Sequence, residues 1–89
     1  MKVLKRSGKL EDFDLKKIQK CLECISDSFE GLLTNSDISN LISEINQKVT
    51  ENYTEQITYK EIRTIVAQTL NDMGFSKASK AYDEFQKSL

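Results

Sequence analysis

The stretch that decides the fold of this chain is residues 3–18, which read VLKRSGKLEDFDLKKI. Two short runs, KVLKR (residues 2–6) and KLEDF (residues 9–13), alternate apolar and charged residues on either side of Ser7-Gly8, and Ser-Gly is a turn signal. This pattern predicts a β-hairpin. A lone hairpin is only marginally stable in water, so we expect it to pack on helices, with Ile57 supplying a third short strand.

Four amphipathic helices are predicted after the hairpin, because apolar residues recur there at intervals of three and four. Their apolar positions are Leu15, Ile18, Leu22, Ile25 and Phe29; Ile38, Leu41, Ile42, Ile45, Val49 and Tyr53; Ile62, Ile65, Val66, Thr69, Leu70 and Met73; and Ala78, Ala81, Tyr82 and Phe85. The expected starts are the N-cap Asp14, Asn35-Ser36-Asp37, the capping box Thr58–Glu61, and Ser76. Gly31 and Gly74 are expected to end the first and third helices. The predicted class is α+β and mostly helical, a hairpin on a small helical bundle.

The length and composition predict one domain, residues 1–89. The chain is 38% hydrophobic and 30% charged, which is typical of a globular protein and not of a disordered one. No apolar run approaches the roughly 18 residues that a membrane span needs. The N-terminus shows no signal peptide. These features predict a cytoplasmic location and no contact with a membrane.

The two cysteines, Cys21 and Cys24, form a single CxxC pair inside the first predicted helix. A structural zinc site needs a tetrahedral set of Cys and His ligands, and the chain has no His and no further Cys. A thioredoxin-like pair would follow a strand in a βαβ unit. We therefore interpret both cysteines as reduced helix residues, buried or half-buried.

Enzymatic activity is not expected. Without His, acid–base chemistry would depend on a carboxylate, Lys, Tyr or Cys with a strongly shifted pKa. The three glycines form no P-loop, dinucleotide fingerprint or nucleophile elbow. The acidic cluster Glu11, Asp12 and Asp14 is interpreted as a hairpin edge followed by an N-cap.

Basic residues gather near the N-terminus. Residues 1–17 carry six basic and three acidic side chains, whereas residues 18–89 carry seven basic and eleven acidic ones. A local positive patch on an acidic body suits a small anion better than duplex nucleic acid. Lys5, Arg6 and Lys17 could converge near the start of the first helix, which itself attracts phosphate. The alternative, that they are solvated charges paired with the nearby carboxylates, stays open at this point.

Lys16 and Lys17 stand in the first turn of that helix, although this end of a helix is positive and favours acidic residues. A bound anion would offset the misfit.

Residues 3–18 resemble the opening of the ATP-cone domain, whose usual pattern is V-x-K-R-(D/N)-G-x-x-E-x-F-(D/N)-x-x-K-I. The matching positions are Val3, Lys5, Arg6, Gly8, Glu11, Phe13, Asp14, Lys17 and Ile18. Ser7 departs from the pattern. Two later blocks, ITYKEIRTIVAQTL and GFSKASKAYDEFQK, resemble downstream segments of the same family, so the similarity covers nearly the whole chain.

The resemblance implies a four-helix bundle capped by a three-stranded mixed sheet. It implies a non-catalytic regulatory domain that binds ATP or dATP, alone or with Mg²⁺, most often within ribonucleotide reductases and also in a repressor of reductase genes. The implied protein partner is a reductase catalytic subunit or further copies of the chain. Direct nucleic-acid binding is not expected.

The resemblance also implies a set of nucleotide-binding residues. Lys5, Arg6 and Lys17 would hold phosphates, while Val3 and Ile18 would flank the base or ribose. The other implied contacts are Glu11 in nucleotide recognition, Arg63 facing the phosphates, Phe85 near the base, and Tyr59 where many members have threonine. Phe13 would pack beneath the hairpin. With a triphosphate as the anion beside Lys17, the resemblance further implies that the start of the first helix is strained when empty and settles when nucleotide binds.

Two alternatives to the regulatory domain remain. One is a helical interaction or oligomerisation module that has lost nucleotide binding, which the departures at Ser7 and Tyr59 favour. The other is a DNA-binding part of a repressor, which the acidic body and the lack of a zinc ribbon disfavour. Whether the chain is a domain of a larger enzyme or acts on a partner as a free-standing protein also stays open.

Overall fold

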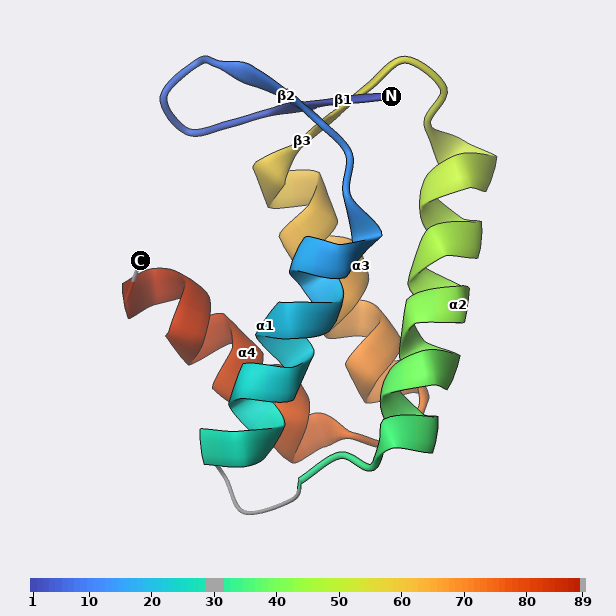
Figure 1. Cartoon of the computed structure of the whole chain (residues 1–89), viewed down its shortest axis with the longest axis vertical. Helices are drawn as coiled ribbons and strands as arrows, with labels where there is room; N and C mark the ends of the chain where they lie inside the picture. Colours follow the sequence, from blue (N-terminus) through green and yellow to red (C-terminus); the bar gives the residue numbers. More distant parts are fainter. Residues whose placement is uncertain (29–31, 89) are drawn as a thin grey trace.

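The structure is a computed structural model that describes residues 1–28 and 32–88, the last two by their backbone only (Figure 1). Its elements are β1 (Lys2–Leu4), β2 (Leu10–Asp12), α1 (Leu15–Ser28), α2 (Asn35–Asn52), β3 (Gln56–Thr58), α3 (Tyr59–Asp72) and α4 (Ser76–Ser88). The predicted α+β class is confirmed, with all four helices and the third strand in the expected order. The helix end predicted at Gly31 and the apolar position at Phe29 lie outside the described residues.

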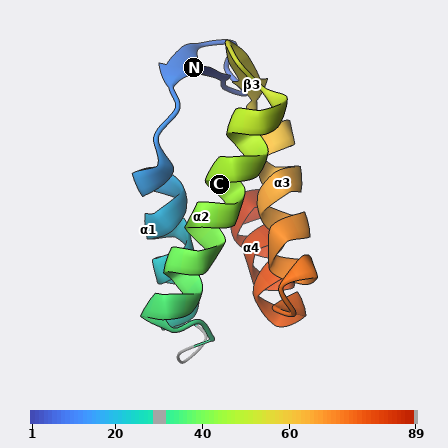
Figure 2. The ribbon, with the colours of Figure 1, turned by 90° about the vertical axis from the view of Figure 1, so that its right-hand side faces the viewer.

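The three strands form one mixed sheet in the order β2-β1-β3. The central strand, β1, is antiparallel to β2 and parallel to β3, with Val3 opposite both Glu11 and Ile57. The side chains of Val3 and Ile57 are buried and belong to the core that the helices share. The sheet thus closes one end of the helical bundle, as two perpendicular views show (Figures 1 and 2).

The hairpin strands are shorter than the sequence pattern suggested, because the turn occupies all of residues 5–9. The backbone N–H of Gly8 donates to the carbonyl of Lys5 at 3.0 Å, and the N–H of Lys5 donates to the carbonyl of Lys9 at 2.9 Å. Gly8 has a φ of 86°, which glycine adopts without strain. Lys5 and Arg6 therefore lie in a turn, where neighbouring side chains can diverge.

Side-chain caps fix the starts of three helices. Before α1, Asp14 Oδ1 accepts from the backbone N–H two residues further on, at 2.9 Å, so the predicted N-cap is confirmed. The capping box formed by Thr58 and Glu61 at α3 is also confirmed. At α2, Thr34 and Asp37 form a capping box that the sequence analysis missed.

The α3 helix, whose last residue is Asp72, is stopped by Gly74, as predicted. This residue has a φ of 87°, and its N–H donates to Asn71, while the N–H of Phe75 donates to the carbonyl of Leu70 at 2.8 Å. The two bonds make a Schellman motif, for which glycine is the usual residue. The prediction that Met73 lies on the apolar stripe is wrong, because Met73 is the C-cap and is 37% exposed.

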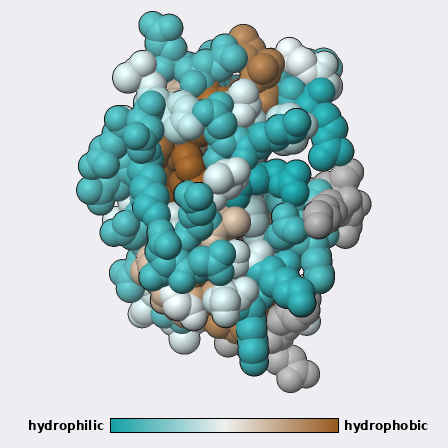
Figure 3. Space-filling view, turned by 180° about the vertical axis from the view of Figure 1, so that it is seen from behind, coloured by the Kyte–Doolittle hydropathy of each residue, from teal (hydrophilic) through white to brown (hydrophobic). Residues whose placement is uncertain are grey.

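The four helices form a closed ring, in which α1 and α3 each pack against both α2 and α4. The fully buried large side chains are Leu22, Ile25, Leu41, Ile45, Val49, Ile57, Val66, Thr69 and Leu70. The face opposite to that of Figure 1 is mainly hydrophilic, with a hydrophobic strip showing between polar side chains in its upper half (Figure 3).

Two residues that were expected to be buried or half-buried, Phe85 and Cys24, are exposed. Phe85 is 37% exposed, although its spacing of four and three residues from Ala81 and Tyr82 places it on the same face of α4 as these two buried residues. Cys24 is exposed, whereas Cys21 is half-buried; both are free thiols.

Candidate functional site

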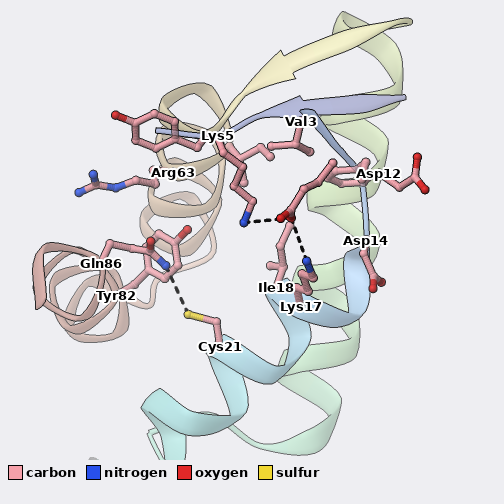
Figure 4. A pocket seen from close by; sticks show the side chains of 14 residues that line it. Val3, Lys5, Asp12, Asp14, Lys17, Ile18, Cys21, Arg63, Tyr82 and Gln86 are labelled. Atoms are coloured by element: carbon pink, nitrogen blue, oxygen red, sulfur yellow. Dashed lines mark hydrogen bonds and ion pairs between the residues drawn. The ribbon is translucent and has the colours of Figure 1, made fainter. Parts of the chain in front are cut away.

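A pocket of about 170 Å³ opens between the hairpin and α1 on one side and α3 and α4 on the other (Figure 4). Its lining residues are Val3, Lys5, Glu11, Asp12, Phe13, Asp14, Lys17, Ile18, Cys21, Tyr59, Ile62, Arg63, Tyr82 and Gln86. They come from segments that are far apart in the sequence. The sheet, the start of α1 and the facing turns of α3 and α4 thus build the pocket together.

The pocket has an apolar interior and a charged rim. Val3, Ile18 and Tyr82 are buried in its wall, whereas the side chains of Lys5 and Lys17 are 42% and 62% exposed. Pockets that enclose a whole drug-sized ligand usually measure about 300 Å³ or more. A pocket of this size therefore suits the apolar part of an amphiphilic ligand and leaves its charged part at the rim.

Two lysines and one carboxylate meet at the rim. The Nζ atoms of Lys5 and Lys17 lie 3.2 and 3.1 Å from the same oxygen, Oε2 of Glu11. The hydrogen bond from Lys17, and then that from Lys5, holds the pKa of Glu11 below its usual value. The cluster carries one net positive charge, and its partly exposed members are accessible to an anion from solvent.

The start of α1 faces the same rim. Asp14 caps the first turn, and Lys17 in that turn pairs with Glu11. An internal carboxylate thus offsets part of the positive charge for which the sequence predicted an external anion. The combination of a helix N-terminus with nearby cationic side chains is a known anion-binding arrangement.

Two arginines near the pocket have partners within the protein. The guanidinium carbon of Arg6 lies 5.6 Å from the centre of the Tyr59 ring, a cation–π contact. Nη2 of Arg63 lies 3.5 Å from Oδ1 of Asp83, and its guanidinium group points away from Lys5 and Lys17 (Figure 4). Arg63 lines the pocket, whereas Arg6 is held beside it by Tyr59.

Neutral polar groups occupy the inner wall where α1 meets α4. Nε2 of Gln86 donates to Sγ of Cys21 at 3.6 Å (Figure 4). Burial raises the pKa of the Cys21 thiol and also that of the Tyr82 hydroxyl. Both groups therefore remain protonated and uncharged near neutral pH.

The structure brings seven of the nine sequence-predicted site residues into the pocket lining: Val3, Lys5, Glu11, Lys17, Ile18, Tyr59 and Arg63. Arg6 and Phe85 are not in the lining. On α4 the pocket is lined by Tyr82 and Gln86, which are one turn apart, whereas Phe85 is not among the lining residues. The roles of all nine residues as ligand contacts stay predictions.

Several lining residues were not predicted from the sequence, among them Cys21, Ile62, Tyr82 and Gln86. The four-residue spacing of Tyr82 and Gln86 placed them on one helical face. The sequence pattern does not show which other helix or strand would lie against that face.

Within residues 1–28 and 32–88, no group of three or more His, Cys, Asp or Glu side chains is placed to hold a metal ion. Over the same residues, none of the helices combines the length and the apolar character that crossing a membrane requires.

The chain matches the family model described as the ATP cone domain over residues 1–88. A search of curated proteins gives no match.

Proposed function

The chain belongs to the ATP-cone family of nucleotide-binding regulatory domains, and we propose that it binds ATP or dATP in the pocket and acts as a non-catalytic allosteric regulator. The observation that carries the proposal is the pocket itself, whose apolar interior opens onto a rim with two lysines and a helix N-terminus. An adenine nucleotide has the matching shape, a flat apolar base joined to a polyanion.

In the proposed complex, the base enters between Val3 and Ile18, and the triphosphate lies along the rim. Lys5 and Lys17 supply the charge, and the first turn of α1 adds backbone donors. Arg63 would join them by turning from Asp83 toward the phosphates. Such a rotation is feasible because this ion pair is long and partly exposed.

Arg6 and Phe85 would contact the ligand only outside the pocket, because neither residue lines it. Arg6 would reach a phosphate after leaving the ring face of Tyr59. Its cation–π contact with this ring is weak at an accessible site. Phe85 would meet only a part of the ligand that extends over α4. Glu11 would keep the two lysines in place and give way as the phosphates approach.

The proposal extends to Mg²⁺, the protein partner and the location. Mg²⁺ is usually held by phosphates together with one or two carboxylates, and Asp12 and Asp14 line the rim. The proposed partner is a ribonucleotide reductase catalytic subunit or further copies of the chain, in the cytoplasm. ATP and dATP differ only at the 2′ position, so any difference in their effects must come from different affinities for two states of the domain.

A calorimetric titration with ATP and with dATP, each with and without Mg²⁺, tests the proposal. We expect binding well below millimolar concentration, and a loss of about tenfold or more in affinity for Lys17→Ala, since hydrogen bonds to charged groups contribute about 1.5–3 kcal/mol. Lys20→Ala is the matched control, because Lys20 is exposed on the same helix and does not line the pocket.

A folded protein that binds neither nucleotide below millimolar concentration would contradict the proposal. The interaction module that has lost nucleotide binding would then be the better interpretation. Equal losses for Lys17→Ala and Lys20→Ala would contradict the location of the phosphates.

A further inference from the structure

Gln86 is the one primary amide among the described residues that line the pocket. It is half-buried on α4, at the inner wall, away from the charged rim. The charged groups of the lining are engaged elsewhere: Glu11 with two lysines, Asp12 with Lys2, and Asp14 with the backbone of α1. Gln86 is therefore in a position to meet the polar edge of a base whose faces lie against apolar side chains.

In the structure the Gln86 amide is hydrogen-bonded to the thiol of Cys21. Its NH₂ group donates to the thiol sulfur, an acceptor that remains a neutral thiol because burial raises the pKa of Cys21. The carbonyl oxygen, Oε1, accepts no hydrogen bond from the described residues. The amide thus offers the pocket an acceptor, while its donor end is turned toward α1.

We propose that Gln86, oriented by Cys21, is the residue that selects an amino-bearing base in this pocket. The inference rests on the proposed function and extends it from nucleotide binding to the choice of base.

The selection follows from hydrogen-bond chemistry. Adenine carries an exocyclic amino group at C6, which donates to a carbonyl oxygen, whereas guanine and hypoxanthine carry a carbonyl oxygen there. Two acceptors that face each other form no hydrogen bond. A 6-oxo purine would require the amide to reverse, which exchanges its N–H···S hydrogen bond to Cys21 for one from the weak S–H donor of that thiol. Cys21 acts here as a positioning residue, because it touches Gln86 and not the base edge.

The test compares ATP with inosine triphosphate, in which a carbonyl oxygen replaces the 6-amino group while the phosphates and ribose are unchanged. We expect the wild-type protein to prefer ATP by about tenfold, the worth of one or two hydrogen bonds at a half-buried site. Gln86→Leu should lower the affinity for ATP to that for inosine triphosphate and leave the latter nearly unchanged. Gln47→Leu is the matched control, since Gln47 is exposed on α2 and bonds to Glu51.

Two further variants separate base selection from a general structural effect. Gln86→Glu keeps the size and the hydrogen-bond acceptor but adds a negative charge. It should therefore lower the affinity for both triphosphates through charge repulsion, while ATP stays preferred. Cys21→Ala should lower the ratio of the affinity for ATP to that for inosine triphosphate toward one, while both ligands still bind. Cys21→Ser keeps a hydrogen-bond acceptor and should restore this ratio. Thermal unfolding of each variant verifies the fold.

The outcomes distinguish this inference from the proposed function. Wild-type protein that binds neither triphosphate contradicts the proposed function. Wild-type protein that binds both equally, or a folded Gln86→Leu that still prefers ATP by the wild-type ratio, overturns only the role of Gln86. A preference that Cys21→Ala leaves intact overturns the role of Cys21 in orienting the amide.

Discussion

At the scale of single residues, Glu11 decides how accessible the cationic rim is. Its carboxylate oxygen Oε2 lies within 3.2 Å of the Nζ atoms of both Lys5 and Lys17, which keeps the two ammonium groups close together despite their repulsion. An incoming polyphosphate has to compete with Glu11 for the same donors. Glu11 therefore both positions the lysines and opposes the anion.

We predict that Glu11→Gln binds triphosphates more tightly than the wild-type protein. The substitution raises the net charge of the cluster from one to two and removes the competing anion. The affinity for inorganic triphosphate, which has no base to lose contacts, should rise by about tenfold at low salt, a change of about 1.4 kcal/mol, and the gain should shrink as salt screens the charges.

Asp72→Asn provides the matched control for that experiment. It removes the same charge from another lysine–carboxylate pair, that of Lys48 and Asp72, which joins α2 to α3 outside the pocket. Tighter binding by Asp72→Asn to the same extent would show that overall charge, and not competition by Glu11, governs affinity. Weaker binding by Glu11→Gln would show that ordering the lysines is the larger effect.

At the scale of elements, the sequence predicted most boundaries because local chemistry sets them. The cap of α1 by Asp14, the capping box of α3 and the stop at Gly74 each depend on neighbours within a few residues. The capping box of α2 was missed because its N3 residue is Asp37, whereas the usual motif has the longer Glu or Gln at this position. The hairpin strands were predicted too long, since the pattern does not show how many residues the turn takes.

The link between β3, α2 and α3 depends on the carboxylate of Glu61. Its Oε1 accepts from the backbone N–H of Thr58 at 3.1 Å and from the Thr58 hydroxyl at 2.9 Å. A hydrogen bond from Tyr53, at the end of α2, is the main cause that lowers the pKa of Glu61, followed by the bonds from Thr58. The charged form of Glu61 is thus the form that stabilises the fold.

We predict that the contribution of Glu61 to stability depends on pH in the acid range. Because its folded-state pKa lies below the unfolded value, the contribution is full above the unfolded pKa and is lost as pH falls through the folded one. Urea unfolding of wild-type protein and Glu61→Gln should therefore differ at pH 7 and converge as the pH is lowered below the usual carboxyl range. Glu44→Gln, on the exposed side of α2, controls for the change in net charge.

A difference between wild type and Glu61→Gln that stays constant through the acid range would contradict this role of the charged carboxylate.

At the scale of the whole molecule, the pocket joins two parts that are distant in sequence. One part, residues 3–21, is nearly contiguous, and its motif made most of its lining predictable. The other part comes from α3 and α4, and its lining depends on how far each helix is rotated in the ring. That rotation follows from packing of the whole core, so Ile62, Tyr82 and Gln86 could not be assigned to the pocket from periodicity alone.

A ligand in this pocket touches both parts, so we predict that ATP stabilises the whole fold. At a free ATP concentration of about 100 times Kd, binding to the folded state adds about 2.7 kcal/mol to the free energy of unfolding. For a chain of this size, that increment corresponds to a rise of roughly 10 °C or more in the midpoint of thermal unfolding. The measurement is thermal unfolding followed by circular dichroism across a series of ATP concentrations.

The same measurement on variants shows whether the rise comes from the pocket. Lys17→Ala should show a smaller shift at equal ATP concentration, and Lys20→Ala should match the wild type. Hydrogen exchange should slow on binding in the hairpin and the start of α1 as well as in α4, since the ligand bridges them. A midpoint that does not move at ATP concentrations where calorimetry shows saturation would mean that ATP binds the unfolded chain equally well. Slowing confined to residues 1–18 would mean that the nucleotide rests on the hairpin without bridging to the facing helices.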